Sequence, residues 1–200
     1  MIKQFQVSIF RALIFVLFLV NSYAQGTEKN ITKLAGSTVL FSAGDSLPLT
    51  ALKSKDFQLV ILVFRAEEDT IGMDPGLSVD GRWRAIHLNK LLRDIDFNGY
   101  FTTPFRSNIL TLQPLLDHKH RKVSYYDQAD IQALSESIKK SFPAPVIVMV
   151  HHETVNIILE QLTQQKVLLP LNGNLSEKMI FVQRSNKYNS TWTAFKYSIR

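Results

Sequence analysis

Residues 59–68, Leu-Val-Ile-Leu-Val-Phe-Arg-Ala-Glu-Glu, decide the fold of this chain. Six apolar residues come first, and the charged side chains of Arg65, Glu67 and Glu68 follow almost at once. A continuous apolar run of this length predicts a strand that is buried on both faces of a parallel sheet. In open α/β sheets, ligands bind outside the carboxyl ends of the strands. We therefore expect the functional site at residues 64–68.

A second apolar strand ends in a similar way. Residues 146–150, Val-Ile-Val-Met-Val, precede His151, His152 and Glu153. Between the two strands in the chain lies the turn of residues 102–106, from which a helix is expected to start. Two buried strands thus end in polar clusters, and these clusters contain the candidate functional residues.

The other segments alternate between strand and helix patterns. Short strands are predicted at 99–103 and 122–126, and Ala129 to Phe142 is amphipathic with helical spacing. The segments 179–183 and 191–197 predict an antiparallel hairpin. Strands that alternate with helices predict an α/β domain: a three-layer α/β/α sandwich with a mostly parallel sheet, followed by a C-terminal β-hairpin.

Two of the expected helices have distinctive local signals. Ser78 is a good N-cap for the first one, and Asp80 complements the positive helix start. Pro104 suits the first turn of the second helix, and Pro114 is expected to end or kink it. The apolar face of the first helix is expected to contain Trp83, Ile86, Leu91, Leu92 and Ile95.

The N-terminus predicts export. A basic start, the apolar run of residues 12–20 and the sequence Asn-Ser-Tyr-Ala at 21–24 are typical of a secretory signal peptide over residues 1–24, cleaved after Ala24. Nine uninterrupted apolar residues are too few to span a membrane, which needs about 20. We expect a periplasmic or secreted protein with no stable membrane span, a leader at 25–56 that contains a possible short hairpin, and one domain at 57–200.

Composition narrows the chemistry. The chain has no cysteine, which excludes disulfides, thiolate catalysis and cysteine-bound metals. Its net charge of +6 is not clustered in any Lys/Arg block, so nucleic acid is not an expected partner. A mildly basic chain suits an anionic small molecule. No cofactor and no metal are expected.

The order and spacing of these motifs resemble the histidine phosphatase superfamily, the phosphoglycerate mutase-like fold. The resemblance rests on the two polar clusters, the turn at 102–106 and the segment Leu-Ser-Val-Asp-Gly-Arg-Trp-Arg-Ala at 77–85. In that family the first strand ends in Arg-His-Gly or Arg-His-Ala. The His is the nucleophile that takes the phosphoryl group, and the Arg binds the phosphate. A second Arg comes from the helix after the turn, and a second His from the end of the last parallel strand.

This sequence departs from the family pattern at the positions that matter most. Phe64 stands where the family has the phosphate-binding Arg, and Arg65 stands at the nucleophile. The helix Arg falls on Ser107, and Arg106 precedes it by one position, which turns a side chain by about 100° around a helix. His151 alone matches a catalytic residue, the second His. Because guanidinium stays protonated, Arg65 cannot act as the nucleophile.

Three hypotheses follow for the function. We expect an exported phosphatase-like domain without catalytic activity that keeps an anion pocket made of Arg65, Arg106, Ser107 and His151, with Thr103 as a further hydroxyl donor. The first alternative is an active phosphomonoesterase whose rearranged site uses His151 or His152. The second alternative is a protein-interaction module, with Phe64 and neighbouring aromatic residues at its surface.

Overall fold

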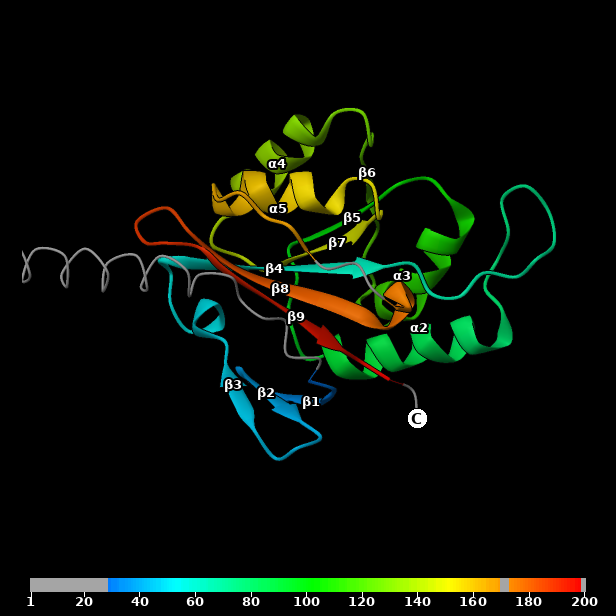
Figure 1. The fold of residues 1–200 in the computed structure, drawn as a ribbon, viewed down its shortest axis with the longest axis horizontal. Coiled ribbons are helices and arrows are strands. Elements are labelled where there is room, and N and C mark those ends of the chain that lie inside the picture. Colours follow the sequence, from blue (N-terminus) through cyan, green and yellow to red (C-terminus); the bar gives the residue numbers. More distant parts are fainter. Residues whose placement is uncertain (1–28, 170–172, 199–200) are drawn as a thin grey trace, which may run out of the picture.

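The computed structural model describes residues 29–169 and 173–198 of the chain, and two sheets organise them (Figure 1). The larger sheet has six strands in the order β6-β5-β7-β4-β8-β9, and the smaller has three in the order β1-β2-β3. The predicted α/β architecture is confirmed: a mostly parallel sheet lies between helices and ends in an antiparallel pair.

Strand β4 (Phe57–Phe64) lies inside the six-stranded sheet and is the first strand predicted from the sequence. It pairs in parallel with β7 (Val146–Val150) and antiparallel with β8 (Lys178–Ser185). Strands β5 (Gly99–Thr102) and β6 (Ser124–Tyr125) extend the parallel part, and β9 (Thr191–Lys196) pairs antiparallel with β8.

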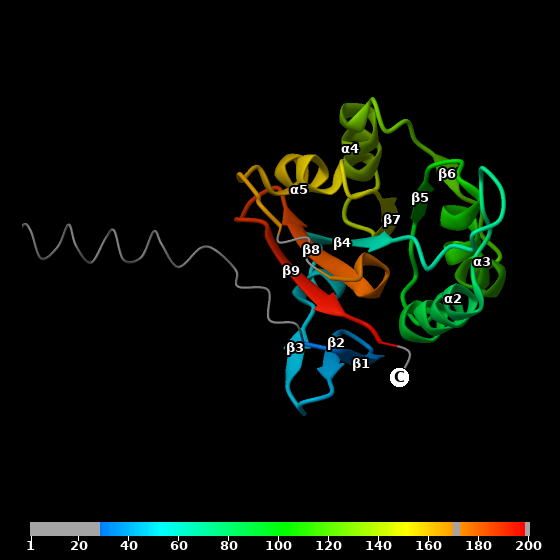
Figure 2. The same ribbon diagram turned by 45° about the vertical axis from the view of Figure 1, so that its right-hand side comes forward.

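Helices cover both faces of this sheet, as Figure 2 shows. Helices α2 (Val79–Leu92) and α3 (Arg106–Lys119) pack on one face. Helices α4 (Ile131–Lys140) and α5 (Val155–Thr163) pack on the other. Strands β4, β5 and β7 run parallel to one another. The polar residues that follow them therefore lie at the same edge of the sheet, where the strands have their carboxyl ends.

The alternation of side chains along β4 divides the core into two. Leu59, Ile61 and Val63 join the cluster under α2 and α3, whereas Val60, Leu62 and Phe64 join the cluster under α4 and α5. Successive side chains of a strand point to opposite faces, so a run without polar residues fills two cores at once. Because β4 is buried on both faces, its apolar run alone predicted a strand inside a sheet that is covered on both sides.

The region at 25–56 was expected to be a leader with a possible short hairpin. Its described part, which begins at residue 29, contains three strands. Strands β1 (Ile31–Ala35), β2 (Thr38–Phe41) and β3 (Ser46–Pro48) form an antiparallel sheet, and the short 3₁₀ helix η1 (Thr50–Leu52) follows. The strand pattern near 37–49 predicted a hairpin, but β1 was missed because Thr32 and Lys33 interrupt its apolar residues. Ile31, Leu34, Val39 and Phe41 are buried in the core under α2.

Helix α2 differs from its prediction in the face that it buries. Ser78 caps it as expected, since its Oγ accepts a hydrogen bond from the Gly81 amide at 3.1 Å. However, Trp83 is 59% exposed and Ile86 lies on the outside, whereas Arg84 and Leu88 are buried. Leu91, Leu92 and Ile95 are buried as expected. The first part of the face was misassigned because a buried charged residue interrupts the apolar pattern there.

Helix α3 differs from its prediction in length. It continues through Pro114 to Lys119, and its C-cap His120 adopts a left-handed conformation with φ of 51°. The segment after Pro114 is therefore helical as far as Lys119. A proline in a helix interior removes one backbone hydrogen bond, and the buried Leu112, Leu115 and Leu116 around it hold the helix together.

The predicted signal peptide at 1–24 lies outside the described residues. Within residues 29–169 and 173–198, no helix is long and apolar enough to cross a membrane.

Candidate functional site

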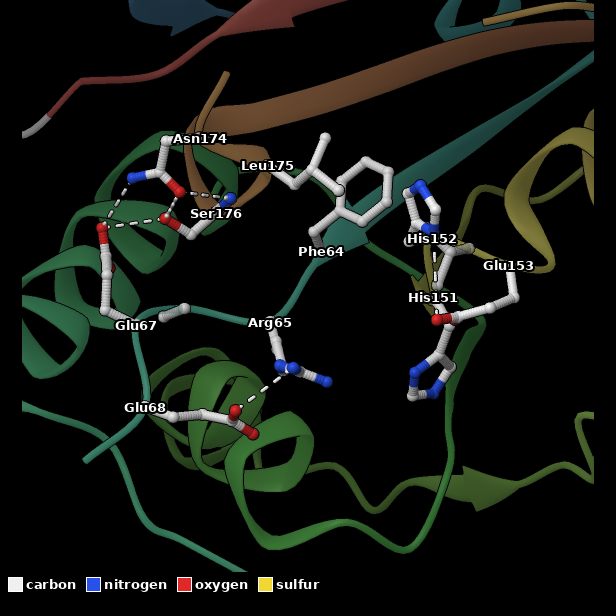
Figure 3. Close-up of a pocket in the computed structure, with 12 residues that line it drawn as sticks. Phe64, Arg65, Glu67, Glu68, His151, His152, Glu153, Asn174, Leu175 and Ser176 are labelled. Atoms are coloured by element: carbon white, nitrogen blue, oxygen red, sulfur yellow. Dashed lines mark hydrogen bonds and ion pairs between the residues drawn. The ribbon is translucent and has the colours of Figure 1, made fainter. Parts of the chain in front are cut away.

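The carboxyl ends of β4 and β7 form the centre of the candidate site. Phe64 is paired with Val150 in the register of the two strands, so Arg65 and His151, the next residues of each chain segment, emerge side by side. A pocket of about 300 Å³ lies over them (Figure 3). It is lined by Phe64, Arg65, Ala66, Glu67, Glu68, Val150, His151, His152, Glu153, Asn174, Leu175 and Ser176.

His151 is buried and held by neutral polar groups. Its Nε2 lies 2.9 Å from Thr103 Oγ1 and 3.2 Å from Asn108 Nδ2, and Asn108 Nδ2 also donates to Thr103 Oγ1 at 2.6 Å. Because an amide nitrogen is a donor, Nε2 accepts here, and the ring proton is on Nδ1. The Phe105 ring packs edge-on against the imidazole with centroids 5.6 Å apart.

The pKa of His151 lies below the ordinary value of an imidazole. Burial lowers its pKa, and the positive charge of Arg65 lowers it further, while Glu153 and Glu68 act in the opposite direction. The surroundings of His151 therefore favour an uncharged hydrogen-bonding ring over a fixed cation.

Arg65 is already engaged by a carboxylate of its own chain. Its Nη2 lies 3.2 Å from Glu68 Oε2, and Glu68 Oε1 accepts a hydrogen bond of 2.7 Å from Ser107 Oγ. Ser107 is buried in the first turn of α3, so it fixes Glu68 from the protein side. In Figure 3 the guanidinium lies between Glu68 and His151.

Glu67 belongs to a separate network behind the pocket. Its carboxylate accepts bonds from Nε of the buried Arg84 at 2.9 and 2.8 Å, and from Ser176 Oγ at 2.8 Å. Burial alone would raise the pKa of Glu67, but these bonds outweigh it and lower the pKa to about 2. Arg84 also donates to the backbone carbonyl of Tyr197 at 3.2 Å, so the network joins the first strand end to the C-terminal segment.

The charges around the pocket are predominantly negative. Arg65 is the cation among its lining residues, and Glu67, Glu68 and Glu153 are the anions. Arg84 neutralises Glu67 from behind, and His152 lies 3.8 Å from Glu153 at the surface. The negative charges of Glu68 and Glu153 outnumber the positive charge of Arg65, so the pocket is not electropositive.

Solved structures of phosphatases share this fold. The protein histidine phosphatase SixA in complex with tungstate aligns with a TM-score of 0.52 at 16% identity, over 70% of this chain and 97% of that one. A mycobacterial glucosyl-3-phosphoglycerate phosphatase aligns at 0.56 and 11%, over 71% and 100%. A mutant phosphoserine phosphatase of Entamoeba histolytica, in complex with phosphoserine, aligns at 0.53 and 11%, over 72% and 98%. The chain has the histidine phosphatase fold. No family model and no curated protein matches its sequence.

Within the histidine phosphatase fold, the predicted site residues separate into two places. Arg65 and His151 line the pocket, Ser107 contacts Glu68 at its wall, and Thr103 lies beside His151. Arg106 points elsewhere: it lines a second cavity between α2 and α3, and its guanidinium lies against Gly76. The 100° offset expected from the sequence explains this separation, since Ser107 and not Arg106 faces the strand ends.

The other two candidates occupy opposite environments. Phe64 is only 3% exposed and belongs to the core under α4 and α5, so it offers little surface to a protein partner. The side chain of His152 is 61% exposed and faces Glu153.

Sequence reasoning missed two residues of the site. Glu68 was treated as part of a charged strand end, although it is the partner of Arg65. Asn108 was not considered, although it is buried and binds His151. A weak signal for Asn108 existed, because asparagine is a poor helix former and its place in the first turns of an otherwise apolar helix needs a reason.

Proposed function

We propose that this protein is an exported, non-catalytic domain of the histidine phosphatase fold that binds an anionic small molecule, such as a phosphorylated compound, without hydrolysing it. The observation that carries the proposal is Arg65, which stands where the resemblance places the nucleophilic imidazole. The related structures were solved with tungstate and with phosphoserine, which supports an anionic ligand.

Phosphoryl transfer through histidine requires a free, neutral ring nitrogen in line with the phosphorus atom. Arg65 cannot supply it, because its guanidinium has no lone pair to share at neutral pH. The cations that should stabilise the transferring group are missing as well. Phe64 and Ser107 stand at the two family Arg positions, and an apolar ring and a hydroxyl cannot replace two fixed positive charges.

The two histidines near the pocket do not replace the nucleophile. Nε2 of His151 is occupied by Thr103 and Asn108. His152 is exposed beside Glu153, where nothing fixes it toward a phosphorus atom held at Arg65. These contacts favour a binding domain over the alternative of an active phosphomonoesterase with a rearranged site.

The test restores the missing groups. The variant Phe64→Arg, Arg65→His is compared with the parent protein in p-nitrophenyl phosphate hydrolysis, with circular dichroism as the check on folding. We expect no turnover in the parent and measurable turnover in the folded double variant, which disappears when His151→Ala is added. Turnover in the parent itself would refute the proposal.

Export follows from the predicted signal peptide and has its own test. The protein expressed with residues 1–24 should be recovered outside the cytoplasm with Gln25 as its first residue, by N-terminal sequencing. Recovery with Met1 retained would contradict this part of the proposal.

A further inference from the structure

Arg65, the cation of the pocket, is already paired with the carboxylate of Glu68. Glu68 contacts Arg65 through Oε2 at 3.2 Å and Ser107 through Oε1 at 2.7 Å, so each carboxylate oxygen has one partner from a different element. The side chain of Glu68 is 28% exposed, whereas that of Arg65 is 51% exposed toward the pocket. An anion that enters the pocket must therefore compete with Glu68 for the guanidinium.

The backbone of Glu68 is fixed as well as its side chain. An antiparallel bridge joins Glu68 to Leu77, and on either side Ser78 N donates to Glu67 O at 2.9 Å and Asp69 N donates to Gly76 O at 2.8 Å. A lone surface ion pair contributes little to structure, but a carboxylate held by a buried hydroxyl on a pinned backbone keeps its position. Glu68 is thus preorganised over Arg65.

We propose that Glu68 is a built-in anion that occupies the position of a ligand oxyanion at Arg65 and so restricts which anions the pocket accepts. This inference rests on the proposed anion-binding function. Its partners Arg65 and Ser107 stand where the resemblance places the nucleophile and the helix Arg, which is where a phosphoryl group would lie between them. A tetrahedral dianion binds only after the carboxylate of Glu68 moves away from Arg65.

The test is tungstate binding measured by isothermal titration calorimetry on the purified protein. Glu68→Gln keeps the size of the side chain and its bond to Ser107 but removes the charge. We expect it to bind tungstate at least tenfold more tightly than the parent, because Arg65 becomes available. Adding Arg65→Gln to Glu68→Gln should abolish the gain.

Glu153→Gln is the matched control, because it removes an equal charge from the same pocket without touching Arg65; its side chain is 74% exposed. We expect its affinity to stay within threefold of the parent. Equal affinity in the parent and Glu68→Gln, or an equal gain in Glu153→Gln, would overturn the inference. Glu68→Ser is the second variant if Glu68→Gln does not fold, and the same tenfold gain is required of it.

The tungstate test of Glu68 and the turnover test of the proposed function can fail independently of each other. All variants with Arg65 intact should remain without turnover of p-nitrophenyl phosphate, whatever their affinity for tungstate. Turnover in the parent would remove the proposed function, whereas unchanged tungstate affinity would remove only the role of Glu68.

Discussion

At the scale of single residues, the region beside the pocket depends on a close contact between α2 and the loop after β4. A Cβ atom on Gly81 would lie 2.1 Å from the backbone oxygen of Glu67. The helix can therefore approach this loop only with glycine at position 81. The same approach brings the buried Arg84 to the carboxylate of Glu67.

Gly81→Ala should destabilise the protein. In an ordinary helix interior this change stabilises by about 0.5 to 1 kcal/mol, because alanine has the higher helix propensity. Here the clash with Glu67 should reverse the sign and lower the free energy of unfolding by about 1 to 3 kcal/mol. Urea denaturation measures the change. A more stable Gly81→Ala protein would show that α2 does not approach the loop this closely.

The Glu67–Arg84 pair should make stability depend on pH. The pKa of Glu67 falls from 4.5 to about 2 on folding, so its stabilisation is complete above 4.5 and is lost as pH falls toward about 2. At pH 7, Glu67→Gln should cost about 2 to 4 kcal/mol, because it leaves Arg84 buried without its main partner. Denaturation of the parent and the variant across this pH range should show the difference between them shrinking on acidification. A constant difference would contradict the assignment.

At the scale of elements, the strands were easier to predict than the helix faces. The run before Arg65 is apolar without interruption and is buried on both sides, so its type and burial follow from composition alone. Helix α2 buries Arg84 and exposes Trp83, which reverses the usual relation of polarity and burial. Local sequence could not show this, because the partner of Arg84 comes from another part of the chain.

The two faces of α2 should respond differently to truncation. Leu88→Ala should lower the free energy of unfolding by about 2 to 5 kcal/mol, because Leu88 is completely buried. Trp83→Ser, on the face that the sequence suggested for the core, should cost less than about 1 kcal/mol. Thermal or urea unfolding distinguishes them. A larger loss for Trp83→Ser would place that face in the core.

At the scale of the whole molecule, the N-terminal strands are part of the core. Phe41 of β2 packs against Phe195 of β9 with ring centroids 5.1 Å apart, and the Lys196 amide donates to Lys29 O at 3.0 Å. The sequence predicted the layered α/β arrangement, since periodicity is local. It could not predict that the region before residue 57 packs on the sheet, because that contact joins the two ends of the chain.

Phe41→Ala should therefore cost as much as a core substitution inside the phosphatase-like region, about 3 to 5 kcal/mol. The measurement is urea denaturation, with Phe105→Ala as the comparison because that residue is 47% exposed, whereas Phe41 is buried. If residues 31–41 were a loosely attached leader, Phe41→Ala would leave the stability of the protein unchanged.

The sequence predicted a site at the strand ends, and the structure brings three of the predicted residues, Arg65, Ser107 and His151, close to one another; whether they bind a ligand stays a prediction. The sequence could not show which groups these three side chains contact. Glu68 lies three residues after Arg65 in a segment that could equally be a solvated loop, and the bridge to Leu77 and the hydrogen bond from Ser107 place it at the guanidinium. The balance of charges around the pocket, and the role proposed for Glu68, can be seen only in the folded structure.

The most direct test of the central claim is steady-state hydrolysis of p-nitrophenyl phosphate by the parent protein, followed beside His151→Ala and a buffer control. Without a nucleophilic imidazole facing the phosphoryl position, the parent should release nitrophenol no faster than His151→Ala or buffer. Catalytic release by the parent that disappears in His151→Ala would contradict the claim and show that this pocket still transfers phosphoryl groups.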